Sequence, residues 1–101
     1  MTAKGYWIAR LNVSDPEGYK AYVAANAEAF SKYGGKFLVR AGRFETVEGE
    51  SRSRNVVLEF RDYETALACY RSPEYAKALA LREGKAVTDL IIIEGYDGPQ
   101  P

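Results

Sequence analysis

The stretch NVVLEF, Asn55–Phe60, reads as a buried strand that carries a single carboxylate, Glu59, between two large apolar residues. Alternate side chains of a strand point to opposite faces of its sheet. One face of this strand is therefore wholly apolar, whereas Glu59 shares the other face with Val57. The apolar face consists of Val56, Leu58 and Phe60. The strand thus belongs to a sheet that has a hydrophobic core on one side and a different environment on the other.

Capping residues mark the helices on either side of this strand. The residues expected to begin three helices are Asp15, Asp62 and Ser72. Pro16 and Pro73 follow two of these caps at the first helical position, where the missing N–H costs nothing. Gly34 or Gly35 ends the first helix, and Gly84 ends the third. The remaining strand-like runs lie at residues 5–13, 36–47 and 88–96, and the polar loop EGESRS at 48–53 joins the two middle strands.

This order of elements favours an α+β fold with a ferredoxin-like βαββαβ protomer. The expected antiparallel sheet has the strand order 4-1-3-2, with the helices on one face. Strand parity assigns the following residues to the helix side: Trp7, Ala9, Leu11, Phe37, Val39, Ala41, Val56, Leu58, Phe60, Ile91 and Ile93. The opposite face receives Tyr6, Ile8, Arg10, Asn12, Leu38, Arg40, Val57, Glu59, Leu90, Ile92 and Glu94.

The second sheet face is too apolar to be left in water. Monomers rarely expose a contiguous apolar patch of more than roughly a few hundred Å². The chain has no spare helix to cover this face, so the sequence predicts a homodimer in which sheet packs on sheet. Glu59 is expected to lie between Arg10 and Arg40, because a buried carboxylate needs partners. This ion cluster has two interpretations: it fixes the register of the dimer, or it binds a ligand.

Length and composition limit the classes of function. The 101 residues form one expected domain, 1–101, with a flexible tail at 98–101. Fourteen basic and fourteen acidic residues give no net charge, which argues against a nucleic-acid partner. No apolar run is long enough to span a membrane, and the N-terminal stretch contains Arg10, unlike a signal peptide, so a cytoplasmic protein is expected. The chain has no histidine, and its single cysteine, Cys69, is expected to be a packed core residue. We therefore expect no metal site and no cofactor.

Tyrosine is the one residue type that suggests a binding site. The chain has eight tyrosines, and several fall on helix stripes that face the sheet. A cleft between helices and sheet could hold a small aromatic or carboxylate ligand, with Arg82 as the anion partner. The candidate ligand-binding residues are Tyr22, Tyr70, Tyr75 and Arg82. The alternative is that these residues belong to the core and its rim, with hydroxyls that reach solvent.

Four landmarks occur together in a fixed order: GYWIARLNVSDPEGYKAYV, YGGKFLVRAG, VVLEF and CYRSPEYAKALALREG, between residues 5 and 84. With them the chain resembles the bacterial domain-of-unknown-function 1330 family, within the dimeric α+β barrel superfamily, from Gly5 to about Gly95. The resemblance implies a ferredoxin-like protomer and a barrel-forming homodimer. It implies no established reaction. The superfamily includes cofactor-independent monooxygenases, isomerases, dehydratases and haem enzymes, but no catalytic motif of theirs matches here, and fold does not determine chemistry.

Three hypotheses for function follow. The first is a homodimer that binds a small organic molecule in the tyrosine-lined cleft without chemistry. The second is a cofactor-independent enzyme, similar to a monooxygenase or isomerase, that acts on a small organic acid or aromatic substrate. In that enzyme a tyrosine hydroxyl or Arg82 would stabilise developing negative charge. The third is a structural interaction module that has no ligand.

Overall fold

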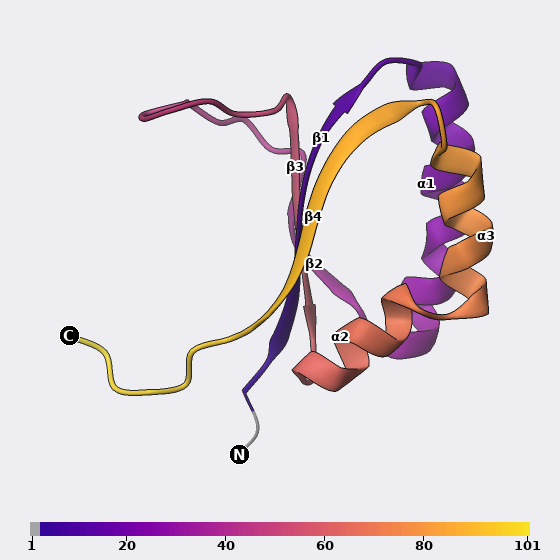
Figure 1. Ribbon diagram of the computed structural model, residues 1–101. Coiled ribbons are helices and arrows are strands. Elements are labelled where there is room, and N and C mark those ends of the chain that lie inside the picture. Colours follow the sequence, from indigo (N-terminus) through magenta and orange to yellow (C-terminus); the bar gives the residue numbers. More distant parts are fainter. Residues whose placement is uncertain (1–2) are drawn as a thin grey trace.

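Two layers, a four-stranded sheet and three helices on one of its faces, make up the computed structural model, which describes residues 3–101 (Figure 1). The elements are β1 (Gly5–Val13), α1 (Pro16–Tyr33), β2 (Lys36–Arg40), β3 (Arg54–Phe60), α2 (Tyr63–Tyr70), α3 (Pro73–Arg82) and β4 (Ala86–Glu94). The sheet has the order β2-β3-β1-β4, and every neighbouring pair is antiparallel. The ferredoxin-like α+β prediction is confirmed. None of the described helices has the length and hydrophobicity that crossing a membrane requires.

The helices begin at the predicted caps. The carboxylate of Asp15 accepts a hydrogen bond from the N–H of Gly18 at 3.0 Å, and Pro16 occupies the first turn. The Asp62 carboxylate and the Ser72 hydroxyl cap α2 and α3 in the same way. Gly34 ends α1 at φ 72°, a backbone angle that glycine adopts without strain. These local contacts fix where each helix begins and therefore which side chains face the sheet.

Strand β2 is shorter than the predicted strand at 36–47, because the chain turns out of the sheet after Arg40. Ala41 has a positive φ of 55°, and its N–H donates to the carbonyl of Asn55 at 2.9 Å. Residues 41–53, which we call the arm, then project from the face of the sheet opposite the helices (Figure 1). Phe44 and Val47 in the arm are exposed. Among residues 3–101, no strand pairs with the strand-like alternation of the arm.

A β-bulge in β2 reverses the predicted faces at the end of this strand. Phe37 lies opposite Leu58, but Val39 lies opposite Val57, so Leu38 is an extra residue on the β2 side. Val39 therefore shares the face of Val57 rather than the helix side. Arg40 lies opposite Val56 and faces the helices, which corrects its predicted position.

The faces of β4 are also the reverse of those predicted. Ile92 lies opposite Trp7, and Leu90 lies opposite Ala9, so both pack against the core under the helices. Ile91 and Ile93 are 54% and 44% exposed on the other side. The run Leu90–Ile93 is apolar on both faces, so its pattern could not decide the orientation, which pairing with β1 decides instead. We call the helix-free side of the sheet the open face; its apolar residues are Tyr6, Ile8, Val39, Val57, Val87, Ile91 and Ile93.

The predicted ion cluster of Arg10, Arg40 and Glu59 does not form within the chain. Glu59 lies opposite Tyr6, whose hydroxyl donates to the Glu59 carboxylate at 3.1 Å. This hydrogen bond is the main reason that the pKa of Tyr6 is raised. Arg10 lies opposite Asn55 and Asp89 instead, and Arg40 faces the helices. Among residues 3–101, neither arginine forms an ion pair with Glu59.

Candidate functional site

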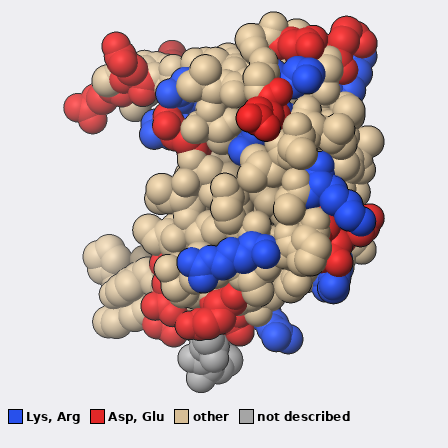
Figure 2. Space-filling model, turned by 45° about the vertical axis from the view of Figure 1, so that its right-hand side comes forward, with Lys and Arg blue, Asp and Glu red and all other residues tan. Residues whose placement is uncertain are grey.

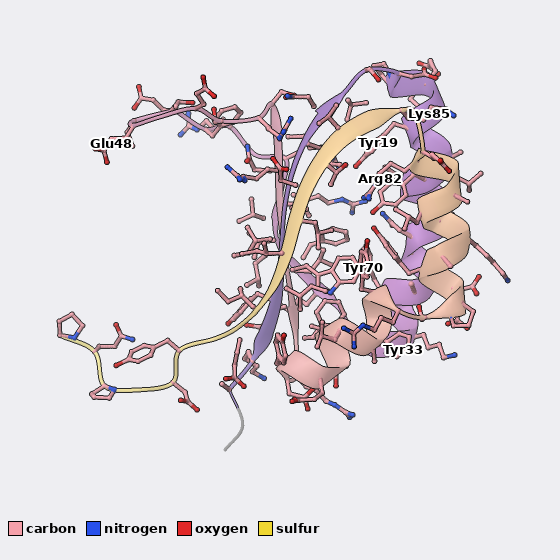
Figure 3. All side chains as sticks on the ribbon, viewed as in Figure 1. Tyr19, Tyr33, Glu48, Tyr70, Arg82 and Lys85 are labelled. Carbon is pink, nitrogen blue, oxygen red and sulfur yellow. The ribbon has the colours of Figure 1, made fainter. Side chains whose placement is uncertain are left out.

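The strongest candidate for a functional group is the guanidinium of Arg82, which extends from the end of α3 toward the sheet (Figure 3). Only 9% of Arg82 is exposed. Its Nη1 donates to the hydroxyl of Tyr22 at 3.3 Å and to the hydroxyl of Tyr75 at 3.2 Å. The two hydroxyls are 2.8 Å apart and hydrogen bond to each other. We call Tyr22, Tyr75 and Arg82 the buried triad.

Local structure explains why these three side chains meet. The Ser72 cap places Tyr75 in the first turn of α3, and its N–H donates to the Ser72 hydroxyl. Arg82 follows seven residues later, two turns along the same helix face. Tyr22 comes from α1, which lies beside α3 (Figure 1). The buried triad therefore joins α1 to α3 on the side of these helices that faces the sheet.

The buried triad has more hydrogen-bond donors than acceptors. A guanidinium has five N–H donors and no acceptor, and a hydroxyl can donate one proton. Burial is the main cause that raises the pKa of Tyr75, so its hydroxyl keeps its proton and remains a donor. Within residues 3–101, no carboxylate lies within ion-pair distance of Arg82. A buried charge that lacks a counterion is costly, and the face of the Tyr22 ring, 5.0 Å from the guanidinium carbon, offsets only part of that cost.

A small cavity of about 30 Å³ lies beside the buried triad, between the helices and the sheet. It can hold about two water molecules. Its apolar walls include Trp7, Phe30 and Leu58. Its polar and charged lining consists of Tyr19, Tyr22, Asn26, Arg40, Arg54 and Arg82. The lining thus contains three arginines and no acidic residue, and the arginines run from buried (Arg82) through partly buried (Arg54) to exposed (Arg40).

The structure brings together three of the four predicted ligand-binding residues. Tyr22 and Arg82 line the cavity, and Tyr75 lies behind them, fully buried and bonded to both. Tyr70, the last residue of α2, lies outside the cavity (Figure 3). It is 36% exposed and borders a separate hollow with Leu67, Leu90 and Ile92. Its ring contacts that of Tyr75, with centroids 5.2 Å apart, so Tyr70 supports the triad from outside the cavity.

Four polar residues of the cavity lining were missing from the predicted ligand-binding residues: Tyr19, Asn26, Arg40 and Arg54. Tyr19 and Asn26 come from the same stripe of α1 as Tyr22, three residues before it and four residues after it. Arg54 begins β3 and shares the parity of Val56, which was the available signal that it faces the helices. Arg40 was predicted on the open face, because the sequence does not show the bulge that precedes it. Residues from α1, α3, β2 and β3 therefore build the polar lining.

Nucleophilic chemistry at the single cysteine is disfavoured by its surroundings. Cys69 is fully buried in α2, and its thiol contacts the carbonyl of Ala29 at 3.7 Å. Burial raises the pKa of this thiol to about 12, so it stays protonated at neutral pH. Over residues 3–101, His, Cys, Asp and Glu side chains nowhere gather in a group of three or more that could hold a metal ion. The arginines that line the cavity are therefore the strongest candidates for functional groups among the described residues.

A family model described as "Domain of unknown function (DUF1330)" matches residues 4–96. No curated protein matches the sequence. Among solved structures, the RPA0582 protein of Rhodopseudomonas palustris, described as of unknown function, is similar with a TM-score of 0.78 at 18% identity. That match covers 97% of this chain and 86% of the other.

Two further solved structures share the fold. SnoaB of Streptomyces nogalater, described as a cofactor-independent oxygenase, has a TM-score of 0.62 at 13% identity, covering 99% of this chain and 97% of its own. A protein of Thermobifida fusca, described as dimeric, ferredoxin-like and of unknown function, has a TM-score of 0.63 at 14% identity, covering 93% and 92%. At such identities the similarity establishes the fold and leaves the chemistry to be argued from the residues.

Proposed function

This chain belongs to the DUF1330 family, and from that premise we propose that it is a homodimer that binds a small organic anion between its helices and its sheet. The observation that carries the proposal is Arg82, a buried guanidinium whose protein partners are two tyrosine hydroxyls. A carboxylate would supply both the missing counterion and the missing hydrogen-bond acceptors. No other arrangement among the described side chains calls for a ligand so directly.

The shape of the cavity limits how the anion binds. Its enclosed volume is about 30 Å³, whereas sites for drug-sized ligands have about 300–1,000 Å³. A single acidic group therefore occupies the enclosed part, against Arg82 and Tyr22. The rest of the ligand extends toward Arg40 at the exposed end. Binding a larger molecule requires the partly exposed side chains at this end to move aside.

The homodimer is proposed from the open face of the sheet. Ile91 and Ile93 are exposed there, and Val39 on β2 is 42% exposed. The arm and the segment after β4 extend on the same side of the sheet (Figure 1), and the space-filling surface is hollowed between two projections (Figure 2). A second copy packed on this face would cover its apolar side chains. The similar protein of Thermobifida fusca is described as dimeric, which supports the same assembly here.

Isothermal titration calorimetry with small carboxylates tests the binding proposal. We expect the unaltered protein to bind a carboxylate and the Arg82→Gln variant to lose at least tenfold in affinity. A matched control is Arg43→Gln, because Arg43 lies on the exposed arm, away from the cavity. Equal affinities for the unaltered protein and Arg82→Gln would contradict the assignment, as would a failure to bind any anion in the test set.

A cofactor-independent enzyme is the second candidate, because the buried triad could also stabilise charge that develops during a reaction. Donors held in a site that excludes water are suited to an enolate or a similar oxyanion. SnoaB, described as a cofactor-independent oxygenase, shares the fold, although not enough sequence to transfer its activity. Turnover of a bound carboxylate that disappears in Tyr22→Phe would favour the enzyme. Binding without turnover would favour the binding protein, and an interaction module without a ligand would show neither.

A further inference from the structure

A second arginine, Arg54, faces the same cavity and also lacks a counterion. Its guanidinium carbon lies 5.4 Å from the centroid of the Tyr19 ring. Its Nε atom is buried and makes no hydrogen bond. In the described chain, no carboxylate lies within ion-pair distance of Arg54. Arg54 thus repeats, on the sheet side of the cavity, the unusual condition of Arg82 on the helix side.

The two guanidinium groups lie against adjacent tyrosine rings that line the cavity. Arg54 lies over Tyr19 and Arg82 lies over Tyr22, and the centroids of these two tyrosine rings are 5.2 Å apart. Burial is the largest cause that raises the pKa of Tyr19, and the charges of Arg54 and Arg82 both oppose that rise. Both charges therefore act on the same hydroxyl. Two positive charges that line one small cavity favour a ligand that carries enough negative charge to neutralise both.

A third unused polar group faces the same space. Asn26 is 7% exposed and lines the cavity. Among residues 3–101, its side-chain amide forms no hydrogen bond, and its polar atoms are not wholly buried, so they can reach a molecule in the cavity. A few polar groups at a binding site fix the orientation of a ligand. The free amide of Asn26 and the unbonded, buried Nε of Arg54 therefore both offer hydrogen bonds to a ligand in this cavity.

We infer that the ligand of this site is a dianion, with one negative charge held by Arg82 and Tyr22 and the other by Arg54. This inference rests on the proposed function and adds the charge of the ligand to it. The amide of Asn26 donates to or accepts from a polar group of the same molecule. Arg40, exposed at the outer end of the cavity, attracts the anion during its approach. The charge can come from a short dicarboxylate or from a single phosphate group, and these two sources are distinguished by experiment.

The test compares small anions of different charge by calorimetry at slightly alkaline pH. Succinate and butyrate form a matched pair with four carbons each, and inorganic phosphate is the third probe. We expect succinate or phosphate to bind at least tenfold more tightly than butyrate, a difference of about 1.4 kcal/mol. A preference for succinate identifies a dicarboxylate site, and a preference for phosphate identifies a phosphate site. Either result supports the inference that the ligand is a dianion.

Variants of Arg54 assign the preference to this residue. We expect Arg54→Gln to weaken the dianion at least tenfold and butyrate much less, which removes the preference, and Arg54→Lys to keep part of the preference. Arg43→Gln on the exposed arm should change neither affinity. If butyrate binds as tightly as both dianions, the dianion inference is wrong and the proposed anion site stands. If no anion binds, both proposals are wrong. The ligand comparison on the unaltered protein decides the inference even if Arg54→Gln does not fold.

Discussion

The hydroxyl oxygens of Tyr22 and Tyr75 lie 2.8 Å apart, although the two residues are 53 positions apart in the sequence. Their hydrogen bond joins α1 to α3 in the interior, and Arg82 donates to both oxygens. A fully apolar contact between these helices would be simpler and would avoid burying a charge. The buried charge of Arg82 is therefore better explained by a role in ligand binding than by a role in stabilising the fold. The two roles predict different effects of Arg82 substitutions on stability.

Arg82→Met should abolish anion binding without lowering the thermal stability of the free protein. Methionine fills similar space, and the substitution removes a buried charge that has no counterion, while the two tyrosine hydroxyls stay bonded to each other. Differential scanning calorimetry without ligand, together with an anion titration, checks both effects. A large loss of stability in the free protein would mean that Arg82 serves the fold, and the functional assignment would then fail.

Tyr22→Phe should weaken anion binding about tenfold, because Tyr22 lines the cavity and a hydrogen bond to a charged group is worth about 1.5–3 kcal/mol. Tyr70→Phe is the matched control, since Tyr70 borders a different hollow. Its affinity for the anion should stay within twofold of that of the unaltered protein. An equal loss in the two variants would show that the tyrosines act through general packing rather than through contact with the ligand.

Asn26→Leu should leave the stability of the free protein unchanged or slightly raised, because it replaces an amide that has no protein hydrogen bond by an apolar side chain of similar size. The same substitution should weaken anion binding. Urea unfolding with and without the ligand measures the two effects on one protein. Destabilisation of the free protein to the same extent as the ligand complex would show that the amide has a structural partner.

Ile91→Asp should weaken the proposed dimer, because it places a charge on the apolar open face, where Ile91 is 54% exposed. Leu81→Asp is the matched control: Leu81 is 44% exposed on α3, on the helix side of the protein. Sedimentation velocity should show a dimer for the unaltered protein and for Leu81→Asp, and a shift toward monomer for Ile91→Asp. A monomeric unaltered protein at micromolar concentration would refute the dimer.

The thiol of Cys69 should not react with a disulfide reagent in the folded protein. Burial raises its pKa to about 12, so the reactive thiolate is scarce at neutral pH, and the side chain is fully buried. Reaction should follow unfolding, and its rate should rise on addition of denaturant. A native reaction rate close to that of free cysteine would contradict the buried position of the thiol.

The sequence predicted the fold well because its signals are local. Caps such as Asp15 and Ser72 define helices through contacts within three residues, and alternation in β1 and β3 defines their buried faces. It failed where orientation depends on a neighbouring strand. The run Leu90–Ile93 is apolar on both faces, and the bulge at Leu38 leaves no mark in the pattern.

The candidate site was predicted in part for the same reason. Tyr22, Tyr75 and Arg82 lie on helix stripes, whose inward faces can be read from their spacing. The position of Arg40 was predicted wrongly, because its face depends on the bulge. Arg54 was overlooked at the start of a strand, although its parity with Val56 points inward. That Arg54 and Arg82 have no counterion can be recognised only from the folded structure, because the sequence does not show which side chains lie near them.

A crystal structure of the protein grown with succinate is the decisive measurement for the anion site. We predict a carboxylate of the ligand within hydrogen-bond distance of the Arg82 guanidinium and the Tyr22 hydroxyl. A cavity that holds only water at saturating succinate, with Arg82 paired to a carboxylate of the protein itself, would contradict it.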